Sequence, residues 1–228
     1  MAGREPTTRE MPRLHLPSPY SSGRPLPEPP ADKGPEKNSR LTAMTAIVLL
    51  VLLAVEGVTV LRITQLLNVH ILVGMLLVPP VLLKMGSTFY RFARYYLGSP
   101  AYRRRGPPPP LLRLLGPVVV VTTVALFASG IALVFATRAG ALRSDLLLLH
   151  KGSFVVWFGA MTLHVLAHIL ETAKLAPLDW YERTRSDVSG ARLRQWAVAF
   201  SLAAGVPLGL LLMGRAGPWL AGFGYVHR

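Results

Sequence analysis

The sequence HKGSFVVWFGAMTLHVLAH, residues 150–168, places three histidines in a stretch whose other side chains are mostly apolar. The apolar run around it covers residues 146–170, which is long enough to cross the roughly 30 Å of hydrocarbon in a bilayer as one helix. An ionisable ring is costly in contact with lipid, so these histidines are expected to face the interior of a helical bundle. They are therefore the first candidates for a buried site.

Four further apolar segments of similar length occur in the chain. Of its 228 residues, 51% are hydrophobic and 16% are charged, whereas soluble domains carry about 25% charged residues. We therefore predict an all-α integral membrane bundle of five transmembrane helices. The predicted spans are residues 41–61, 63–84, 114–136, 146–170 and 195–213.

The charged residues predict how the chain crosses the membrane. Residues 1–40 contain nine prolines and should form a disordered cytoplasmic tail, while residues 214–228 should form a short external tail. Nineteen of the 25 Lys and Arg residues lie in the three segments that this topology places in the cytoplasm. The positive-inside rule then puts the N-terminus on the cytoplasmic side of the cell membrane and the C-terminus on its external side. The net charge of +14 is read as this topology signal and not as a nucleic-acid surface.

A fourth histidine lies on the second predicted span. This span crosses the membrane in the same direction as the fourth, and His70 lies in it at the depth of His150. Two neutral imidazoles at one depth on different helices are suited to ligate the iron of a haem b. Gly74 would let the porphyrin approach, and Arg62 and Lys151 would pair with its propionates. The plainer interpretation is that both histidines are interfacial residues at helix ends.

The inner half of the fourth span is less easily interpreted. His164 follows His150 by fourteen residues, which is about 40° short of four full helical turns, so both share one face. A second haem at His164 or His168 would need an unusual second ligand such as Lys84, or five-coordinate iron. His164 and His168 could instead bind a non-haem metal from one helix. They could also hydrogen-bond to Glu171 or to lipid phosphate.

Two further positions in the spans call for interpretation. Glu56 lies in the outer part of the first span and could take up a proton near the outer haem, or pair with Arg62 or Lys151. Ser129 and Gly130 in the third span mark a place where another group can approach the backbone closely. The paired prolines of residues 78–80 should bend the second span.

The paired histidines on two apolar helices, with a fourteen-residue step on one, resemble those of membrane-embedded b-type cytochromes. The membrane subunits of hydrogenases and formate dehydrogenases are the nearest analogy, over roughly residues 41–213. The resemblance implies a four-helix haem-binding core with one added helix, in which His70 and His150 ligate the outer haem iron and His164 an inner one. Lys84 departs from the two-haem pattern of that family.

The same resemblance implies a function in electron transport. The chain would pass electrons between the membrane quinone pool and a partner oxidoreductase. With no cysteine it has no iron–sulfur ligands, so we expect an electron-transfer subunit and not a stand-alone enzyme. The alternative is a non-redox membrane protein, such as a metal-binding transporter or an assembly factor. The broken helices at matching positions that are typical of transporters have no clear counterpart here.

Overall fold

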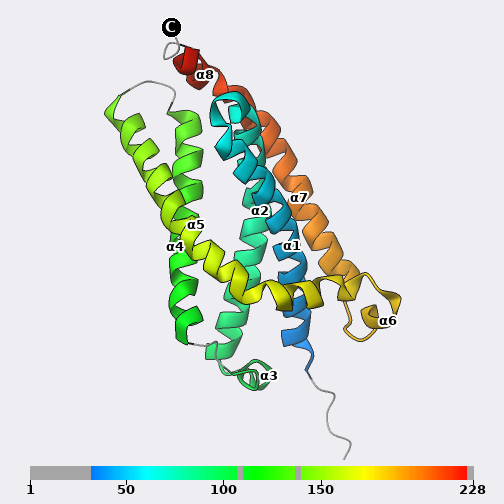
Figure 1. Ribbon diagram of the computed structural model, residues 1–228. Coiled ribbons are helices and arrows are strands. Elements are labelled where there is room, and N and C mark those ends of the chain that lie inside the picture. Colours follow the sequence, from blue (N-terminus) through cyan, green and yellow to red (C-terminus); the bar gives the residue numbers. More distant parts are fainter. Residues whose placement is uncertain (1–31, 107–109, 137–139, 225–228) are drawn as a thin grey trace, which may run out of the picture. The chain divides into compact units, whose positions relative to one another are not determined.

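The computed structural model describes residues 32–106, 110–136 and 140–224. These residues form helices and connecting turns, and no strand occurs among them (Figure 1). Five of the described helices are long and apolar enough to cross a membrane, which confirms the predicted all-α membrane bundle. They are α1 (Gly34–Leu61), α2 (Ile63–Tyr96), α4 (Pro110–Phe135), α5 (Ala141–Leu175) and α7 (Ala191–Met213). The short helices are α3 (Pro100–Arg103), η1 (Ala176–Asp179), α6 (Glu182–Arg185), η2 (Gly214–Ala216) and α8 (Gly217–Gly224).

The helices extend beyond the predicted spans because apolar length alone does not mark where helical backbone ends. The first turns of α1 belong to the segment predicted as a disordered tail, of which residues 1–31 lie outside the described residues. Helix α2 continues through its aromatic and basic end to Tyr96. Part of the predicted external tail is helical as η2 and α8, and residues 225–228 are not described.

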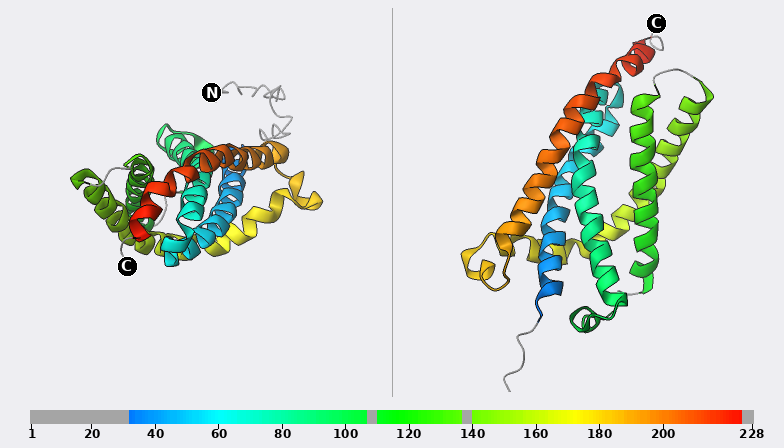
Figure 2. Two further views of the ribbon diagram at one scale, coloured as in Figure 1. Left: turned by 90° about the horizontal axis from the view of Figure 1, so that it is seen from above. Right: turned by 180° about the vertical axis from the view of Figure 1, so that it is seen from behind.

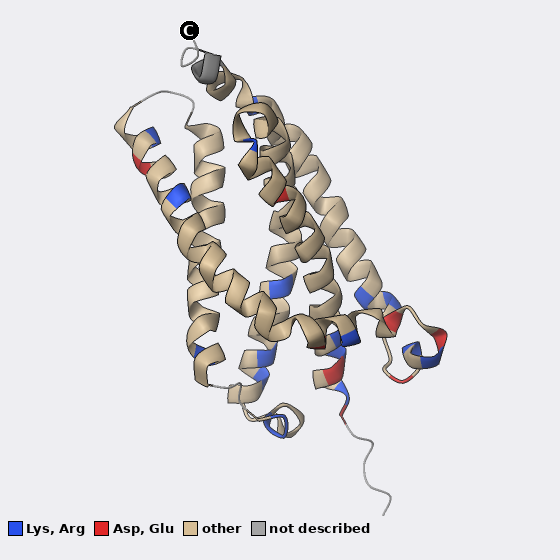
Figure 3. Cartoon of the chain, viewed as in Figure 1, with Lys and Arg blue, Asp and Glu red and all other residues tan. Residues whose placement is uncertain are grey.

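The long helices run in alternating directions. Helices α4 and α5 form an antiparallel pair, while α2 packs against both α1 and α7 (Figures 1 and 2). Helices α3 and α6 lie at one end of the bundle together with the start of α1, and this end is here called the α3 end. The α1–α2 junction and α8 lie at the other, here called the α8 end. Many of the Lys and Arg residues lie toward the α3 end (Figure 3).

The contact between α2 and α7 depends on two glycines. Because Pro80 has no backbone N–H, the carbonyl of Leu76 loses its usual helical donor. Gly205 covers this carbonyl so closely that an added Cβ would lie 2.6 Å from the Leu76 oxygen. Gly209, one turn later, would place a Cβ 2.8 Å from the oxygen of Leu72. Helix α7 therefore lies along α2 with its backbone in close approach.

The backbone of α2 departs from helical angles at a different place from the one expected. We predicted a bend at residues 78–80, but the non-helical angles of α2 occur at Leu66, with φ −113° and ψ 20°. Proline is compatible with helical φ, although inside a helix it removes a hydrogen bond and crowds the carbonyl four residues earlier. The helical angles persist through the prolines, at the place where α7 lies against the Leu76 carbonyl.

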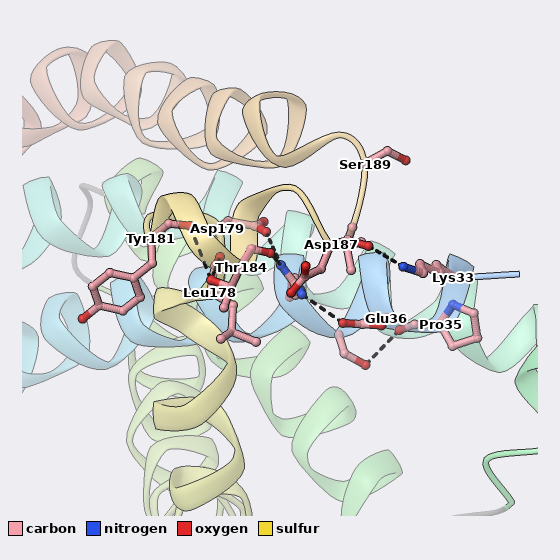
Figure 4. Close-up of polar contacts among 12 residues, drawn as sticks. Lys33, Pro35, Glu36, Leu178, Asp179, Tyr181, Thr184, Asp187 and Ser189 are labelled. Atoms are coloured by element: carbon pink, nitrogen blue, oxygen red, sulfur yellow. Dashed lines mark hydrogen bonds and ion pairs between the residues drawn. The ribbon is translucent and has the colours of Figure 1, made fainter. Parts of the chain in front are cut away.

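A buried ionic cluster joins three elements at the α3 end. Asp179 of η1 is fully buried and lies between Arg40 of α1 and Arg194 of α7. Arg40 Nη1 donates to Asp179 Oδ1 at 3.1 Å, and Arg194 Nη2 donates to the same oxygen at 2.7 Å. Arg40 also donates to the backbone oxygen of Thr184 at 2.8 Å, close to Asp179 in Figure 4. This cluster ties the end of the α5 segment to the starts of α1 and α7.

Candidate functional site

The imidazole rings of His70 on α2 and His150 on α5 lie close together in an edge-on arrangement. Their centroids are 6.3 Å apart and their planes are inclined by 83°. Both residues are partly buried in the bundle. The structure thus brings together the two histidines that the sequence singled out, while their role as ligands stays a prediction.

The ring of His150 is held by α4. Its Nδ1 lies 3.1 Å from the backbone oxygen of Leu126 and 3.2 Å from Oγ of Ser129. A backbone carbonyl can only accept a hydrogen bond, so Nδ1 carries the proton and Nε2 keeps a free lone pair.

Gly130 makes room for this ring. A Cβ added there would lie 3.0 Å from Cε1, 3.4 Å from Nδ1 and 3.9 Å from Nε2 of His150. The close approach expected at Ser129 and Gly130 is therefore made by the imidazole, with Nε2 as the more distant nitrogen.

The ring of His70 is held by α1. Its Nδ1 lies 3.0 Å from Oε1 of Glu56 and 3.0 Å from Oγ1 of Thr59. With the Glu56 carboxylate as the acceptor, Nδ1 of His70 carries the proton, and Nε2 has no partner among the described residues. We expected Glu56 to act as a proton relay or to pair with Arg62 or Lys151. Its contacts in the structure are with His70 and Thr59.

The other residues assigned to this site occupy different surroundings. Gly74, where we expected a porphyrin to approach, lies against the Glu56 carboxylate, because an added Cβ would be 3.3 Å from Oε1. Arg62 and Lys151 are exposed, and they lie close in the sequence to His70 and His150, respectively. Within the described part of the chain, neither side chain forms a hydrogen bond or an ion pair. Their predicted pairing with propionates stays a prediction.

The inner histidines form a separate pair. The ring centroids of His164 and His168 are 4.8 Å apart on α5. Lys84 interacts electrostatically with both rings, but its Nζ donates to the backbone oxygen of Thr42 at 3.0 Å. No further histidine faces this pair among the described residues. They also contain no group of three or more His, Cys, Asp or Glu residues that could hold a metal ion.

The outer histidines fit a haem iron by their separation and by their hydrogen bonds. A ligating nitrogen lies about 2 Å from its metal and the ring centre about 1 Å further, so two axial imidazoles have centres about 6 Å apart. The observed separation is 6.3 Å. A metal-ligating histidine usually donates its other ring N–H to a carboxylate or backbone carbonyl. His70 has a carboxylate acceptor in Glu56, and His150 has a backbone carbonyl acceptor in Leu126.

Sequence reasoning missed two of the residues that hold the rings. Thr59 lies three residues after Glu56 on the same face of α1, and this spacing could have identified it. The Leu126 acceptor is a backbone carbonyl and leaves no mark in the sequence.

No protein-family model, curated protein or solved structure matched this chain when it was compared with them. What can be inferred about function therefore comes from the residues themselves.

Proposed function

We propose that this chain is a membrane-embedded haem b-binding electron-transfer protein, with His70 and His150 as the axial ligands. The observation that carries the proposal is the pair of imidazoles with centroids 6.3 Å apart, each with Nδ1 bonded to an acceptor and with no partner for Nε2 among the described residues. Haem b, when bound, supplies one-electron redox chemistry.

Four helices would contribute to this site. Helices α2 and α5 carry the ligands, α1 orients His70 through Glu56, and α4 orients His150 through the Leu126 carbonyl. Helix α7 packs on α2 through Gly205 and Gly209. This arrangement supports the predicted four-helix core with one added helix.

The partners of the proposed reaction follow from the resemblance to hydrogenase and formate dehydrogenase membrane subunits. We propose that electrons pass between a membrane quinone and a partner oxidoreductase subunit. A chain without cysteine cannot supply an iron–sulfur relay of its own. The charge distribution favours the cytoplasmic membrane, with the N-terminus and the α3 end in the cytoplasm.

The proposal is tested by purifying the full chain in detergent from cells supplied with haem. Reduced-minus-oxidised spectra and a pyridine haemochrome assay should show bis-histidine haem b, close to one per chain. His70→Ala and His150→Ala should each lose it, while His168→Ala, with its ring outside the proposed site, should keep it.

Thermal unfolding of each variant shows whether it has folded. A folded, colourless wild-type protein would overturn the proposal and favour a non-redox membrane protein, such as a transporter or an assembly factor.

A further inference from the structure

The partner of the His70 imidazole is a carboxylate inside an apolar helix. The side chain of Glu56 is 15% exposed and that of His70 is 22% exposed, with 3.0 Å between Oε1 and Nδ1. Oγ1 of Thr59 lies 3.1 Å from the other carboxylate oxygen, and Thr59 itself is buried. Glu56 is therefore held from one side by its own helix and directed at the ring from the other.

The two histidines differ in the charge of their partners. Nδ1 of His150 bonds to the neutral carbonyl of Leu126 and lies beside the neutral hydroxyl of Ser129. Nδ1 of His70 bonds to the carboxylate of Glu56. Within the described residues, this carboxylate forms no ion pair with an Arg or Lys side chain. The negative charge of Glu56 is thus directed mainly at His70.

A charged acceptor changes the chemistry of the ring beyond fixing its tautomer. Hydrogen bonds to ionised groups are shorter and roughly twice as strong as those between neutral groups. A carboxylate that draws the Nδ1 proton makes Nε2 a stronger electron donor to a metal. Such a ligand stabilises the more positive, ferric state of a haem relative to the ferrous state.

We propose that Glu56 is a positioning residue that directs Nε2 of His70 to the haem and lowers the reduction potential of the haem. This inference rests on the proposed haem site at His70 and His150. It differs from the proton relay considered from the sequence, because the carboxylate is assigned a constant electrostatic role.

The test is an optical redox titration of the full chain in detergent, with Glu56→Gln compared with the wild type. Glutamine keeps an oxygen acceptor but removes the charge, so the midpoint potential should rise. Haem affinity should fall about 10- to 100-fold, as is typical when the partner of a metal-ligating histidine is altered. Glu36→Gln is the matched control, since Glu36 lies on the same helix but bonds to Arg40 at 3.0 Å. Its potential should equal that of the wild type.

The outcomes separate this inference from the proposed function. A wild-type protein without haem overturns the haem site itself. A haem-loaded Glu56→Gln protein with the wild-type potential overturns the role of Glu56 and leaves the haem site intact. If Glu56→Gln does not retain haem, Glu56→Asp serves in its place, because it keeps the charge but withdraws it from Nδ1. An unchanged potential in Glu56→Asp then overturns the inference, and a raised one supports it.

Discussion

Gly130 and His150 face each other across the α4–α5 pair, and a Cβ added to Gly130 would lie 3.0 Å from Cε1 of the ring. Gly130→Ala should therefore push the imidazole away from the Leu126 carbonyl and lower haem affinity about tenfold or more. The measurement is haem retention during titration with a competing haem acceptor. Gly116→Ala is the control on the same helix, since nothing lies within 4 Å of its added Cβ. Equal haem retention in the two variants would contradict this prediction.

The packing of α7 on α2 should tolerate no side chain at Gly205. Alanine there would place its Cβ 2.6 Å from the Leu76 oxygen, so the two helices must move apart. We expect a loss of about 1–3 kcal/mol in stability, the usual cost of overpacking, seen as a lower Tm in detergent. Gly159→Ala on α5, with open space around the added Cβ, should leave Tm unchanged or raise it slightly. A Gly205→Ala protein as stable as Gly159→Ala would show that the α2–α7 contact is looser than described.

The ionic cluster at the α3 end should be sensitive to loss of its central charge. Asp179→Asn leaves the buried guanidinium groups of Arg40 and Arg194 without a carboxylate partner. Breaking a buried pair in this way typically costs about 3–5 kcal/mol. Thermal unfolding should show a large drop in Tm for Asp179→Asn and a small one for Glu36→Gln, because the side chain of Glu36 is 37% exposed. Similar drops in both variants would mean that Asp179 does not dominate the cluster.

The orientation of the chain can be measured because the sequence contains no cysteine. Single cysteines introduced at Ser144 and at Ser186 would lie on exposed residues near the α8 end and the α3 end, respectively. If the α3 end is cytoplasmic, as the positive-inside rule predicts, an impermeant maleimide should label Ser144→Cys in intact cells. Ser186→Cys should react only after lysis. The reverse pattern would place the N-terminus outside.

The inner histidines should not change the haem content. His164→Ala removes the ring predicted for a second haem, but no histidine other than its neighbour His168 lies close to it within the described residues. Lys84 is bonded to the Thr42 backbone oxygen. We therefore expect a haem-to-protein ratio equal to that of the wild type. A ratio that falls by half in His164→Ala would assign a second haem to that side chain.

Much of the architecture was predictable because it depends on local properties of the chain. Apolar length reports how many helices can cross a bilayer, and it predicted five. Helical periodicity and depth also predicted that His70 and His150 would approach each other, as their rings do. The helix ends were less accurate, because polar residues beyond the apolar spans continue as helix.

The contacts that define the candidate site depended on the tertiary structure. Periodicity gives the direction of a side chain around its own helix, but not the rotation or separation of one helix relative to another. Close packing sets those, as where Gly205 meets the Leu76 carbonyl. For this reason the sequence alone determined that Glu56 lies within a membrane span, and only the tertiary structure decided that its partner is His70.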